Sequence, residues 1–491
     1  MTATSDVIVI GGGAAGLGTA LALARTGRSV TVLERDETHM PDTPDEAFRA
    51  LPRRGAPQVR HSHAFLARLR LLLAARAPDV LAALLEQGAT ELRFVDNLPP
   101  TLTGFTPQAG DEDLVALACR RVTFDWVLRR AVLAESGVTL VGGSPVQGLL
   151  CAPRPPGRSG APHIVGARTA NGDYRGRLIV DAGGRASSLP AWLEAVGASR
   201  PSEEQSDISI LYLSRFYRLE EAAGPPPVDG VVGGDLGYMK YGVFPGDSGT
   251  FSITLAIPTD DPELRGLLRP AAFDALAAVL PTTAGWITGG RAVALDPDGG
   301  DVAVMAKLRN RVRRIVVDGA PTATGIVSVG DAAVVTNPLY GRGTSLALVH
   351  AYALADLVSD GPGDDDPVAL PVAFDGETRR LLEPWYRAAV FQDGQDEVVR
   401  RAVAAGDQEQ ADRLLAVRGA LFAMIRTDPA VWRGFVRTLN LLDPPEALLA
   451  DPRVASKLME AVQDGQSAPR PLDETGLGPS RDETLRILAA A

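Results

Sequence analysis

The sequence predicts an α/β fold with a second, antiparallel sheet and a helical C-terminal region. Three observations predict it: a glycine-rich turn between a buried strand and a helix near the N-terminus, alternating β-forming segments in the middle of the chain, and a helix-rich last quarter. The 491 residues exceed one ordinary core, so we expect two or three domains. With 45% hydrophobic and 22% charged residues, the composition is typical of a globular protein.

Charge and cysteine content exclude several classes of protein. The formal net charge of −11 disfavours nucleic acid as a partner, because phosphate binding needs a basic face. No apolar run approaches the ~20 residues of a membrane span, so we expect no integral membrane segment. The chain enters a strand directly, and no secretory signal is expected. Two cysteines, Cys119 and Cys151, are too few for a disulfide framework, which favours a cytoplasmic protein.

The first motif lies at the N-terminus. Residues 6–10 (DVIVI) are typical of a buried parallel strand, and a G-x-G-x-x-G pattern of Gly11, Gly13 and Gly16 separates this strand from a helix. Gly11 permits the tight turn, Gly13 lets the backbone approach a pyrophosphate, and Gly16 lets the helix pack on the sheet.

The residues after this turn complete a dinucleotide-binding pattern. Ala14 and Ala15 begin the helix, where free N–H groups and the positive end of the helix dipole would meet phosphates. Glu34 closes the next strand, where a carboxylate can accept both ribose hydroxyls. Glu34 argues against a 2′-phosphorylated ligand, although Arg35 beside it leaves that point open. The pattern predicts a dinucleotide site, with a merely structural glycine turn as the alternative.

A second glycine turn distinguishes a flavin from a nicotinamide dinucleotide. Residues 325–332 (GIVSVGDA) are predicted to form a strand ending in Asp331, whose carboxylate can hold the hydroxyls of a ribityl chain. Gly341 and Gly343 leave backbone N–H groups uncovered at the start of the next helix, and Thr344 follows them. Those amides and the helix dipole can stabilise negative charge on a reduced flavin.

An N-terminal dinucleotide fold paired with a late Gly-Asp strand resembles the FAD-binding fold of the p-hydroxybenzoate hydroxylase type. Asp331 matches the ribityl-binding aspartate of that family. Arg121 matches the arginine of its R-x-x-[LF]-[DE] helix near the flavin chain, with a solvated arginine as the alternative, and Val146 matches a strand that contacts the adenine. The segment with Asp181 and Arg185 resembles the family's D-x-G motif.

The segment at 53–69 (RRGAPQVRHSHAFLARL) indicates a subfamily. It resembles the G-[VA]-P-Q-x-x-H-x-H segment of bacterial flavin epoxidases that act on polyketide polyenes in polyether biosynthesis. That resemblance implies that Gln58 borders the cofactor and that Arg60, His61 and His63 are candidate catalytic residues. Loop histidines that pin the backbone are the alternative for the pair, and no metal site is expected because no further ligand lies at suitable spacing.

The loop at 337–343 (NPLYGRG) resembles the N-P-x-Y-G-x-G loop of the same epoxidases. Arg342 departs from that pattern. An arginine beside the flavin edge could favour an anionic substrate or could point to solvent, and the sequence does not decide between the two. The tryptophans lack the W-x-W-x-I-P arrangement of flavin halogenases, which disfavours halogenation.

The middle of the chain is predicted to form the substrate side. Residues 206–219, 236–246 and 249–258 alternate as strands of an antiparallel sheet do. The substrate candidates on these strands are Tyr212, Arg215, Tyr238 and Tyr241. Residues 359–367 (SDGPGDDDP) are predicted to be a linker, followed by a helix-rich region.

The predicted fold class is therefore α/β, with a Rossmann-like FAD-binding domain, an antiparallel β-sheet substrate domain and a helical C-terminal region. The predicted FAD-binding domain is discontinuous and consists of residues 1–75, 111–200 and 320–360. The predicted substrate domain consists of residues 76–110 and 201–319. Residues 361–491 are predicted to form the linker and a helical C-terminal cap.

The family resemblance implies an FAD-dependent monooxygenase. It implies transfer of one oxygen from a flavin C4a-hydroperoxide to an alkene (epoxidation) or a ring (hydroxylation) of a natural-product-like substrate. We expect a hydrophobic polyketide, terpenoid or aromatic substrate, with NAD(P)H or a separate flavin reductase as the electron source. Two alternatives stay open: a flavin-dependent reductase or dehydrogenase of isoprenoid double bonds, and a flavin-binding protein without turnover.

Overall fold

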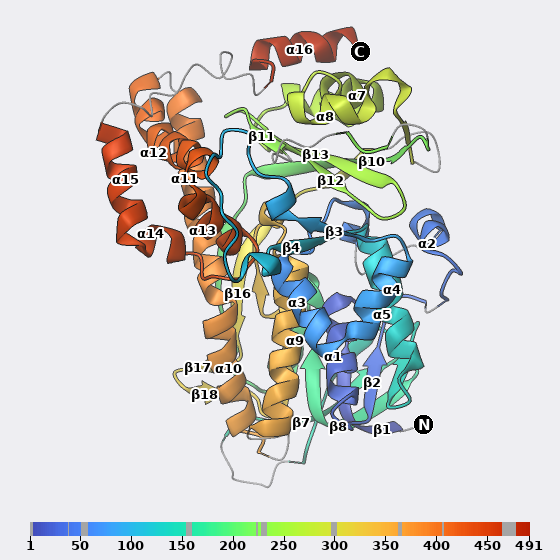
Figure 1. The fold of residues 1–491 in the computed structure, drawn as a ribbon. Helices are drawn as coiled ribbons and strands as arrows, with labels where there is room; N and C mark the ends of the chain where they lie inside the picture. The colour runs from blue at the N-terminus through green and yellow to red at the C-terminus, as the bar shows by residue number, and fades with distance from the viewer. Residues whose placement is uncertain are drawn as a thin grey trace.

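Two main sheets and a flank of C-terminal helices make up the molecule (Figure 1). The computed structural model describes residues 3–37, 39–50, 57–153, 160–221, 224–226, 233–295, 302–361, 366–404, 407–463 and 478–491. Residues 53–56 of the epoxidase-like segment and 362–365 of the expected linker lie outside the described residues.

A seven-stranded sheet carries the predicted dinucleotide site. Its strand order is β5-β2-β1-β8-β7-β6, and β19 also pairs with β8. The pairings among β5, β2, β1, β8 and β19 are parallel, whereas β7 pairs antiparallel with both β8 and β6. The strands are β1 (Ala3–Ile10), β2 (Val30–Leu33), β5 (Val138–Val141), β6 (Val146–Cys151), β7 (Ile164–Thr169), β8 (Gly172–Asp181) and β19 (Ile326–Ser328).

The register of this sheet brings distant parts of the chain to one edge. Ile10 of β1 pairs with Asp181 of β8, and Asp181 pairs with Ser328 of β19. Val7 and Val9 are fully buried, as expected for a parallel strand with both faces covered. Because parallel strands end at the same edge, the turns after β1 and β19 must lie close together.

Helices α1 (Ala14–Ala24) and α9 (Gly343–Asp360) pack closely against each other. A Cβ on Gly18 would lie 3.1 Å from Cδ1 of Leu348, so a small residue is needed at this contact. The other helices around this sheet are α2 (Pro44–Ala50), α3 (Ala67–Arg76), α4 (Pro78–Glu86), α5 (Arg121–Ala134) and α6 (Leu189–Ala195).

The second sheet has the order β11-β12-β13-β10-β14, with β15 also on β10. Its strands are β10 (Ile210–Leu219), β11 (Gly233–Asp235), β12 (Lys240–Pro245), β13 (Thr250–Pro258), β14 (Ala292–Ala294) and β15 (Ala303–Met305). Helices α7 (Pro270–Ala277), α8 (Pro281–Ile287) and α16 (Arg481–Ala490) cover its outer face, and the seven-stranded sheet lies on its other side (Figure 1).

Two predicted strands need correction. The strand expected over 206–219 is interrupted: β9 (Ser202–Asp207) belongs to a separate three-stranded sheet, and β10 begins at Ile210. The strand expected to end at Asp331 stops at Ser328, because Gly330 adopts a φ of +60° that an extended strand does not contain. Asp331 therefore lies in a 3₁₀ turn, Gly330–Ala332.

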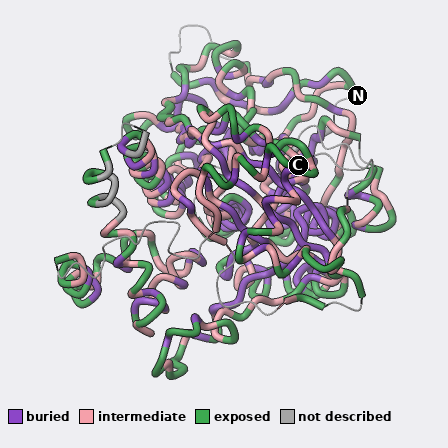
Figure 2. The backbone as a smooth tube through the Cα atoms, turned by 90° about the horizontal axis from the view of Figure 1, so that it is seen from above, coloured by how far each residue is buried: buried purple, intermediate pink, exposed green. Residues whose placement is uncertain are grey.

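The C-terminal helices flank both sheets. They are α10 (Ala369–Leu381), α11 (Glu383–Ala404), α12 (Gln408–Thr427), α13 (Pro429–Leu439), α14 (Ala447–Ala450) and α15 (Pro452–Gln463). The small sheets pair β3 (Thr90–Arg93) with β4 (Val115–Ala118), β17 (Val316–Val317) with β18 (Ala320–Pro321), and β16 (Arg309–Arg314) with both β9 and β20 (Val334–Val335). Figure 2 shows buried backbone gathered in the middle of the molecule, with exposed residues on the outlying helices.

The predicted fold class is confirmed, with a mixed α/β architecture and a helical C-terminal region. The domain boundaries stay a prediction. Helix α16 packs against α7, and Leu488 joins the core between the second sheet and helices α7 and α8. The described end of the chain therefore contacts the region of the second sheet and not only the other C-terminal helices. In the part of the chain that the structure describes, no helix has the length and apolar character to cross a membrane.

Candidate active site

The two predicted glycine turns lie against each other. A Cβ on Gly330 would be 2.9 Å from the Cβ of Ala15, so the turn that carries Asp331 touches the first turn of α1. Two segments separated by some 300 residues in the sequence therefore form one surface. This contact places Asp331 beside the predicted pyrophosphate site.

In the first turn, two glycines are required by close packing and one faces open space. Gly11 has a φ of +108°, and a Cβ on it would be 2.6 Å from the carbonyl oxygen of Ala182. A Cβ on Gly16 would be 1.8 Å from the carbonyl oxygen of Gly11. No atom lies within 4 Å of a Cβ on Gly13, and no side chain caps α1. The uncapped N–H groups of Ala14, Ala15 and Gly16 are thus available to an anion.

Glu34 lies next to this turn and is held in place by backbone amides. Its Oε2 accepts a hydrogen bond from the Gly12 amide at 2.8 Å, and its Oε1 accepts one from the Asp36 amide at 2.9 Å. The residue is only 4% exposed, whereas Arg35 points to the surface. The carboxylate is therefore fixed beside the glycine turn, where the sequence predicts a ribose.

The second turn repeats this design. Gly341 has a φ of +63°, and a Cβ on it would be 2.8 Å from the Cβ of Ala64. Gly343 begins α9 without a side-chain cap, and no atom lies within 4 Å of a Cβ on it. Each turn therefore has one open glycine at an uncapped helix start, which is what two ends of one bound dinucleotide would need.

Asp331 has a carboxylate that no described residue hydrogen-bonds. Only its backbone oxygen is engaged, and it accepts from Nη2 of Arg311 at 2.8 Å. Burial raises the pKa of the carboxyl, while the charges of Arg121, Arg185 and Arg311 oppose that shift. A half-buried acceptor without a protein donor among the described residues fits a ligand that brings its own hydroxyl groups.

Arg121 joins the two sides of the site. Its Nη1 donates to Oγ1 of Thr344 at 2.8 Å and lies 3.3 Å from Nε2 of His63, while its Nε donates to Asp125 at 2.7 Å. Nδ1 of His63 donates to the backbone oxygen of His61 at 2.9 Å. Burial and the charge of Arg121 lower the pKa of His63 to about 3, so its ring is neutral.

His61 connects this segment to the second sheet. Its Nδ1 lies 3.0 Å from Oγ of Ser214, and Ser214 lies 2.7 Å from Oγ1 of Thr254. Thr254 is 2.6 Å from Oγ of Ser62, which closes a chain of hydroxyl groups between the loop and strands β10 and β13. Burial and the charge of Arg185 lower the pKa of His61 to about 4, against a hydrogen bond to the Val304 backbone that raises it.

A cavity of about 350 Å³ opens beside these residues. Its lining residues are Gln58, Arg60, His61, Arg185 and 303–306. Arg60 also lies over the ring of Phe48, with its guanidinium carbon 5.0 Å from the ring centroid. The structure thus gathers Gln58, Arg60 and His61 around one space, whereas His63 packs behind them against Phe65, 6.2 Å between ring centroids.

The predicted substrate residues divide between the two faces of the second sheet. Tyr212 lies on the inner face, and its hydroxyl donates to Oδ1 of Asn337 at 2.6 Å. Arg215 pairs with Asp274 of α7 at 2.7 Å, which places it on the outer face. Tyr238 bonds Thr484 of α16 at 2.7 Å, and Tyr241 belongs to the core beneath α7 and α8. The structure does not bring Arg215, Tyr238 or Tyr241 to the site.

Val146 begins β6 and packs against the core of the seven-stranded sheet.

Sequence reasoning missed four polar residues near the site: Ser214, Thr254, Asn337 and Asp393. Asp393 lies on α11 and accepts hydrogen bonds from Asn310, Asn337 and Tyr340. A polar residue on the inner face of an otherwise apolar alternating strand was the available signal for Ser214. In the described part of the chain, no group of three or more His, Cys, Asp or Glu side chains is arranged to hold a metal ion.

Comparison with known proteins agrees with this geometry. The model of the family "FAD dependent oxidoreductase" matches residues 6–96, which contain the first glycine turn and Glu34. The chain therefore contains an FAD-dependent oxidoreductase domain. The predicted FAD cofactor and the predicted oxidoreductase activity are thereby confirmed, and the open glycines and the free Asp331 carboxylate fit that cofactor.

The oxidoreductase has relatives with the same overall fold. Protein Rv3254 of Mycobacterium tuberculosis is 30% identical over 484 residues and covers 89% of each chain, so the two proteins belong to one family. PqsL of Pseudomonas aeruginosa, described as a probable FAD-dependent monooxygenase, has a TM-score of 0.56 at 18% identity, over 84% of this chain and 99% of that one. The anhydrotetracycline hydroxylase OxyS of Streptomyces rimosus has a TM-score of 0.55 at 17% identity, over 90% and 76% of the two chains. At such identities the likeness to PqsL and OxyS shows a shared fold.

Proposed function

We propose that this oxidoreductase is a monooxygenase that places one oxygen atom of O₂ on an alkene (epoxidation) or a ring (hydroxylation) of a small organic substrate. FAD, when bound, supplies the activation of O₂ and the electrons for the transfer. Direct reduction by NAD(P)H, or reduction by a separate flavin reductase, is part of the proposal. The cytoplasmic location expected from the sequence also stays a proposal.

The observation that carries the proposal is a pair of uncharged imidazole rings next to the two glycine turns: His61 lines the cavity, and His63 lies behind it in contact with Arg121. The ring of His61 is buried and that of His63 is half-buried, and their pKa values are lowered to about 4 and about 3, so both are neutral and neither can act as an acid at neutral pH. An activated oxygen species must be kept away from water and from strong acids that would release it without transfer. A neutral imidazole can still orient such a group by hydrogen bonding.

The remaining residues position the reactants. With FAD bound, the N–H groups at the start of α1 would hold the pyrophosphate, Glu34 the ribose and Asp331 the ribityl hydroxyls. The N–H groups at the start of α9 would favour negative charge on the flavin. Arg121 connects the start of α9 to the histidine segment, because it donates a hydrogen bond to Thr344 and contacts His63. Ser214 orients His61 from the second sheet.

The test uses the FAD-loaded protein with ¹⁸O₂. Reduced enzyme is mixed with ¹⁸O₂ and a panel of polyenes, terpenoids and aromatic acids, with NADPH, NADH or a flavin reductase as the reductant. One ¹⁸O atom per product molecule is expected. Products formed equally well without O₂ would instead identify a double-bond reductase, and a protein that oxidises no reductant under any condition would be a flavin carrier.

A further inference from the structure

Arg342 is a buried cation without a partner. It is 5% exposed and directly precedes Gly343 at the start of α9. Its Nε and Nη1 are fully covered and have no hydrogen-bond partner, and no described residue forms an ion pair or a hydrogen bond with its Nη2. Burial lowers its pKa to about 10, so the side chain stays protonated at neutral pH. It does not point to solvent, one of the two orientations that the sequence left open.

Two aromatic rings hold the guanidinium in place but do not neutralise it. Its central carbon lies 4.6 Å from the ring centroid of Tyr340 and 4.7 Å from that of Trp385 on α11. Cation–π contacts contribute roughly 0.5–2 kcal/mol, whereas a buried charge without a counter-ion costs several kcal/mol. Natural proteins keep such a group where a ligand supplies the missing charge.

Asp393 is the carboxyl group whose charge acts on Arg342, and it is not the ion-pair partner of that residue. The two side chains do not form an ion pair within 4 Å, and the Asp393 oxygens instead accept from neutral groups of Asn310, Asn337 and Tyr340 at 2.6, 2.7 and 3.2 Å. Burial raises the pKa of Asp393, while the hydrogen bonds from Asn310, Asn337 and Tyr340 oppose that shift, and its oxygens face these neutral donors and not Arg342.

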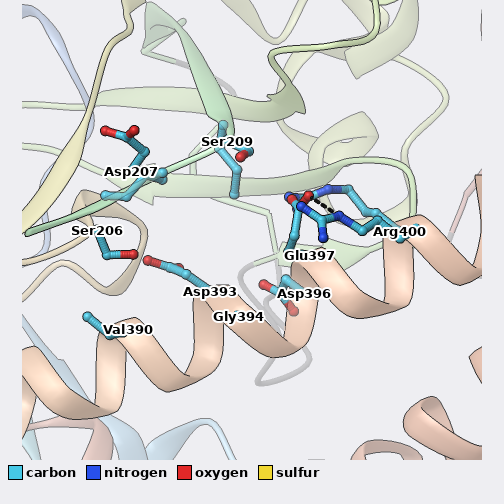
Figure 3. A pocket seen from close by; sticks show the side chains of 12 residues that line it. Ser206, Asp207, Ser209, Val390, Asp393, Gly394, Asp396, Glu397 and Arg400 are labelled. Carbon is cyan, nitrogen blue, oxygen red and sulfur yellow. Dashed lines mark hydrogen bonds and ion pairs between the residues drawn. The ribbon is translucent and has the colours of Figure 1, made fainter.

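A cavity of about 310 Å³ lies beside Asp393, the hydrogen-bond partner of Tyr340. It is formed between α11 and residues 206–210, and Figure 3 shows Asp393 pointing from α11 toward Ser206. Tyr340 contacts both Arg342 and Asp393, and Leu339 packs against Ile208 and Ile210, which line the cavity. Arg342 is therefore linked to the lining of this cavity through Tyr340 and Asp393.

The other charged groups of this cavity are already paired. Asp396 pairs with Lys240 at 2.6 Å and with Arg418 at 2.5 Å. Glu397 pairs with Arg400 and Arg401, and Asp207 pairs with Arg309 at 2.7 Å. Arg342 does not line the cavity itself, but it is the described cation next to Tyr340 that still lacks an anion.

We propose that Arg342 binds the carboxylate of an organic acid substrate and thereby determines substrate specificity. A carboxylate is a single negative charge whose two oxygens match the edge of a guanidinium group. A phosphate dianion would need further donors, and no second unpaired cation lies here among the described residues. The inference rests on the proposed function, because it names the class of substrate that the monooxygenase takes.

The test measures binding, so it does not depend on oxygen transfer. Benzoate and its neutral analogue benzamide are titrated into the FAD-loaded wild-type protein, with the flavin absorbance spectrum and Tm as readouts. Wild type should bind benzoate at least about tenfold more tightly than benzamide, because a charged hydrogen bond is worth about 1.5–3 kcal/mol. Equal binding of both probes, or binding of neither, would overturn the assignment.

Two variants separate a ligand-binding arginine from a structural one. R342M keeps an apolar contact with Tyr340 and Trp385, should lose the preference for benzoate, and should keep a ligand-free Tm at or above that of wild type. The control is R433M, because Arg433 also lies over an aromatic ring, 4.9 Å from Phe105, but pairs with Asp111 at 2.6 Å. R433M should lower Tm and keep the benzoate preference.

Three outcomes for R342M would contradict the proposal. If Tm falls as far as in R433M, Arg342 supports the fold. If benzoate binding persists, another group receives the anion. If FAD affinity drops more than about tenfold, Arg342 belongs to the cofactor site. Failure of ¹⁸O incorporation alongside a benzoate preference that depends on Arg342 would refute the monooxygenase activity and leave the anion site standing.

Discussion

The two ends of the cofactor site are built in different ways. At the first turn, contacts within residues 11–36 and one neighbouring strand position the glycines and Glu34. At the second turn, Gly341 packs on Ala64, Thr344 bonds Arg121, and the facing loop is tied to the second sheet through His61. The first end is therefore a local motif, whereas the second is assembled from four separate parts of the chain. A substitution at the first turn should therefore disturb that turn alone, whereas a substitution at the second turn should also disturb the other segments that contact it.

Gly13→Val should have the largest effect on cofactor binding. Gly13 has a φ of −82° and open space at its Cβ, so the ligand-free variant should fold with a Tm close to that of wild type. FAD affinity should fall at least a hundredfold, about 3 kcal/mol, because the new side chain occupies the pyrophosphate position. Fluorescence titration with FAD measures this. The matched variant Gly343→Val should lose less FAD affinity, since only the amides at the start of α9 are blocked. Equal losses of FAD affinity in the two variants would contradict the difference between the two turns.

Acidification should weaken the second end through His61. The pKa of His61 is lowered from 6.5 to about 4, so the unfolded state binds the proton more tightly than the folded state. Its contribution to stability is present above pH 6.5 and is lost as the pH falls toward 4, by about 2 kcal/mol at pH 5. Urea unfolding of wild type and His61→Asn at pH 7 and pH 5 measures the difference. Identical pH slopes in the two proteins would contradict a neutral His61.

Asp331→Asn should lower FAD affinity by about tenfold, or roughly 1.4 kcal/mol, since a charged acceptor is replaced by a neutral one. The ligand-free protein should keep its stability, because no described residue donates to the Asp331 carboxylate. Glu34→Gln is the contrasting variant, since Glu34 accepts from two backbone amides and its loss should also lower Tm. Thermal unfolding and FAD titration of both variants measure the difference. Asp331→Asn should change only FAD affinity, whereas Glu34→Gln should change FAD affinity and Tm.

Ser214→Ala should have the smallest effect, about 1 kcal/mol of stability, because His61 loses one hydrogen-bond partner. If the proposed function is correct, more of the consumed O₂ should appear as hydrogen peroxide, because the ring of His61 is less well oriented. Peroxide release per reductant oxidised measures this. Ser456→Ala on α15, outside the hydroxyl chain and both cavities, serves as the control and should leave that ratio unchanged.

The same contrast explains what the sequence could predict. Gly11, Gly13, Gly16 and Glu34 form a pattern whose spacing alone implies its geometry, and the family resemblance extended that prediction to Asp331. Arg215 was assigned to the substrate side because strand residues alternate, but which face turns inward depends on where α7 docks. Period-two patterning identifies two faces of a strand without telling which face meets the site.

Arg342 and His61 show the other limit. Both lie in loops, where no periodicity predicts burial, and their environments come from residues more than 40 positions away: Trp385 for one and Ser214 for the other. The sequence therefore left open whether Arg342 meets solvent or an anion. Only tertiary packing shows that it is enclosed.

The position of β19 has a consequence for the newly synthesised protein. Before β19 exists, the segment of β8 from Ile179 to Asp181 lacks a neighbour on one side, and β19 is made only when roughly two thirds of the polypeptide has left the ribosome. Until then the backbone N–H and C=O groups on that edge of β8 have no strand partner, and this edge lies next to the predicted FAD site. Because the turn that carries Asp331 has not yet been made at that stage, we expect chaperones to bind this exposed strand edge during translation.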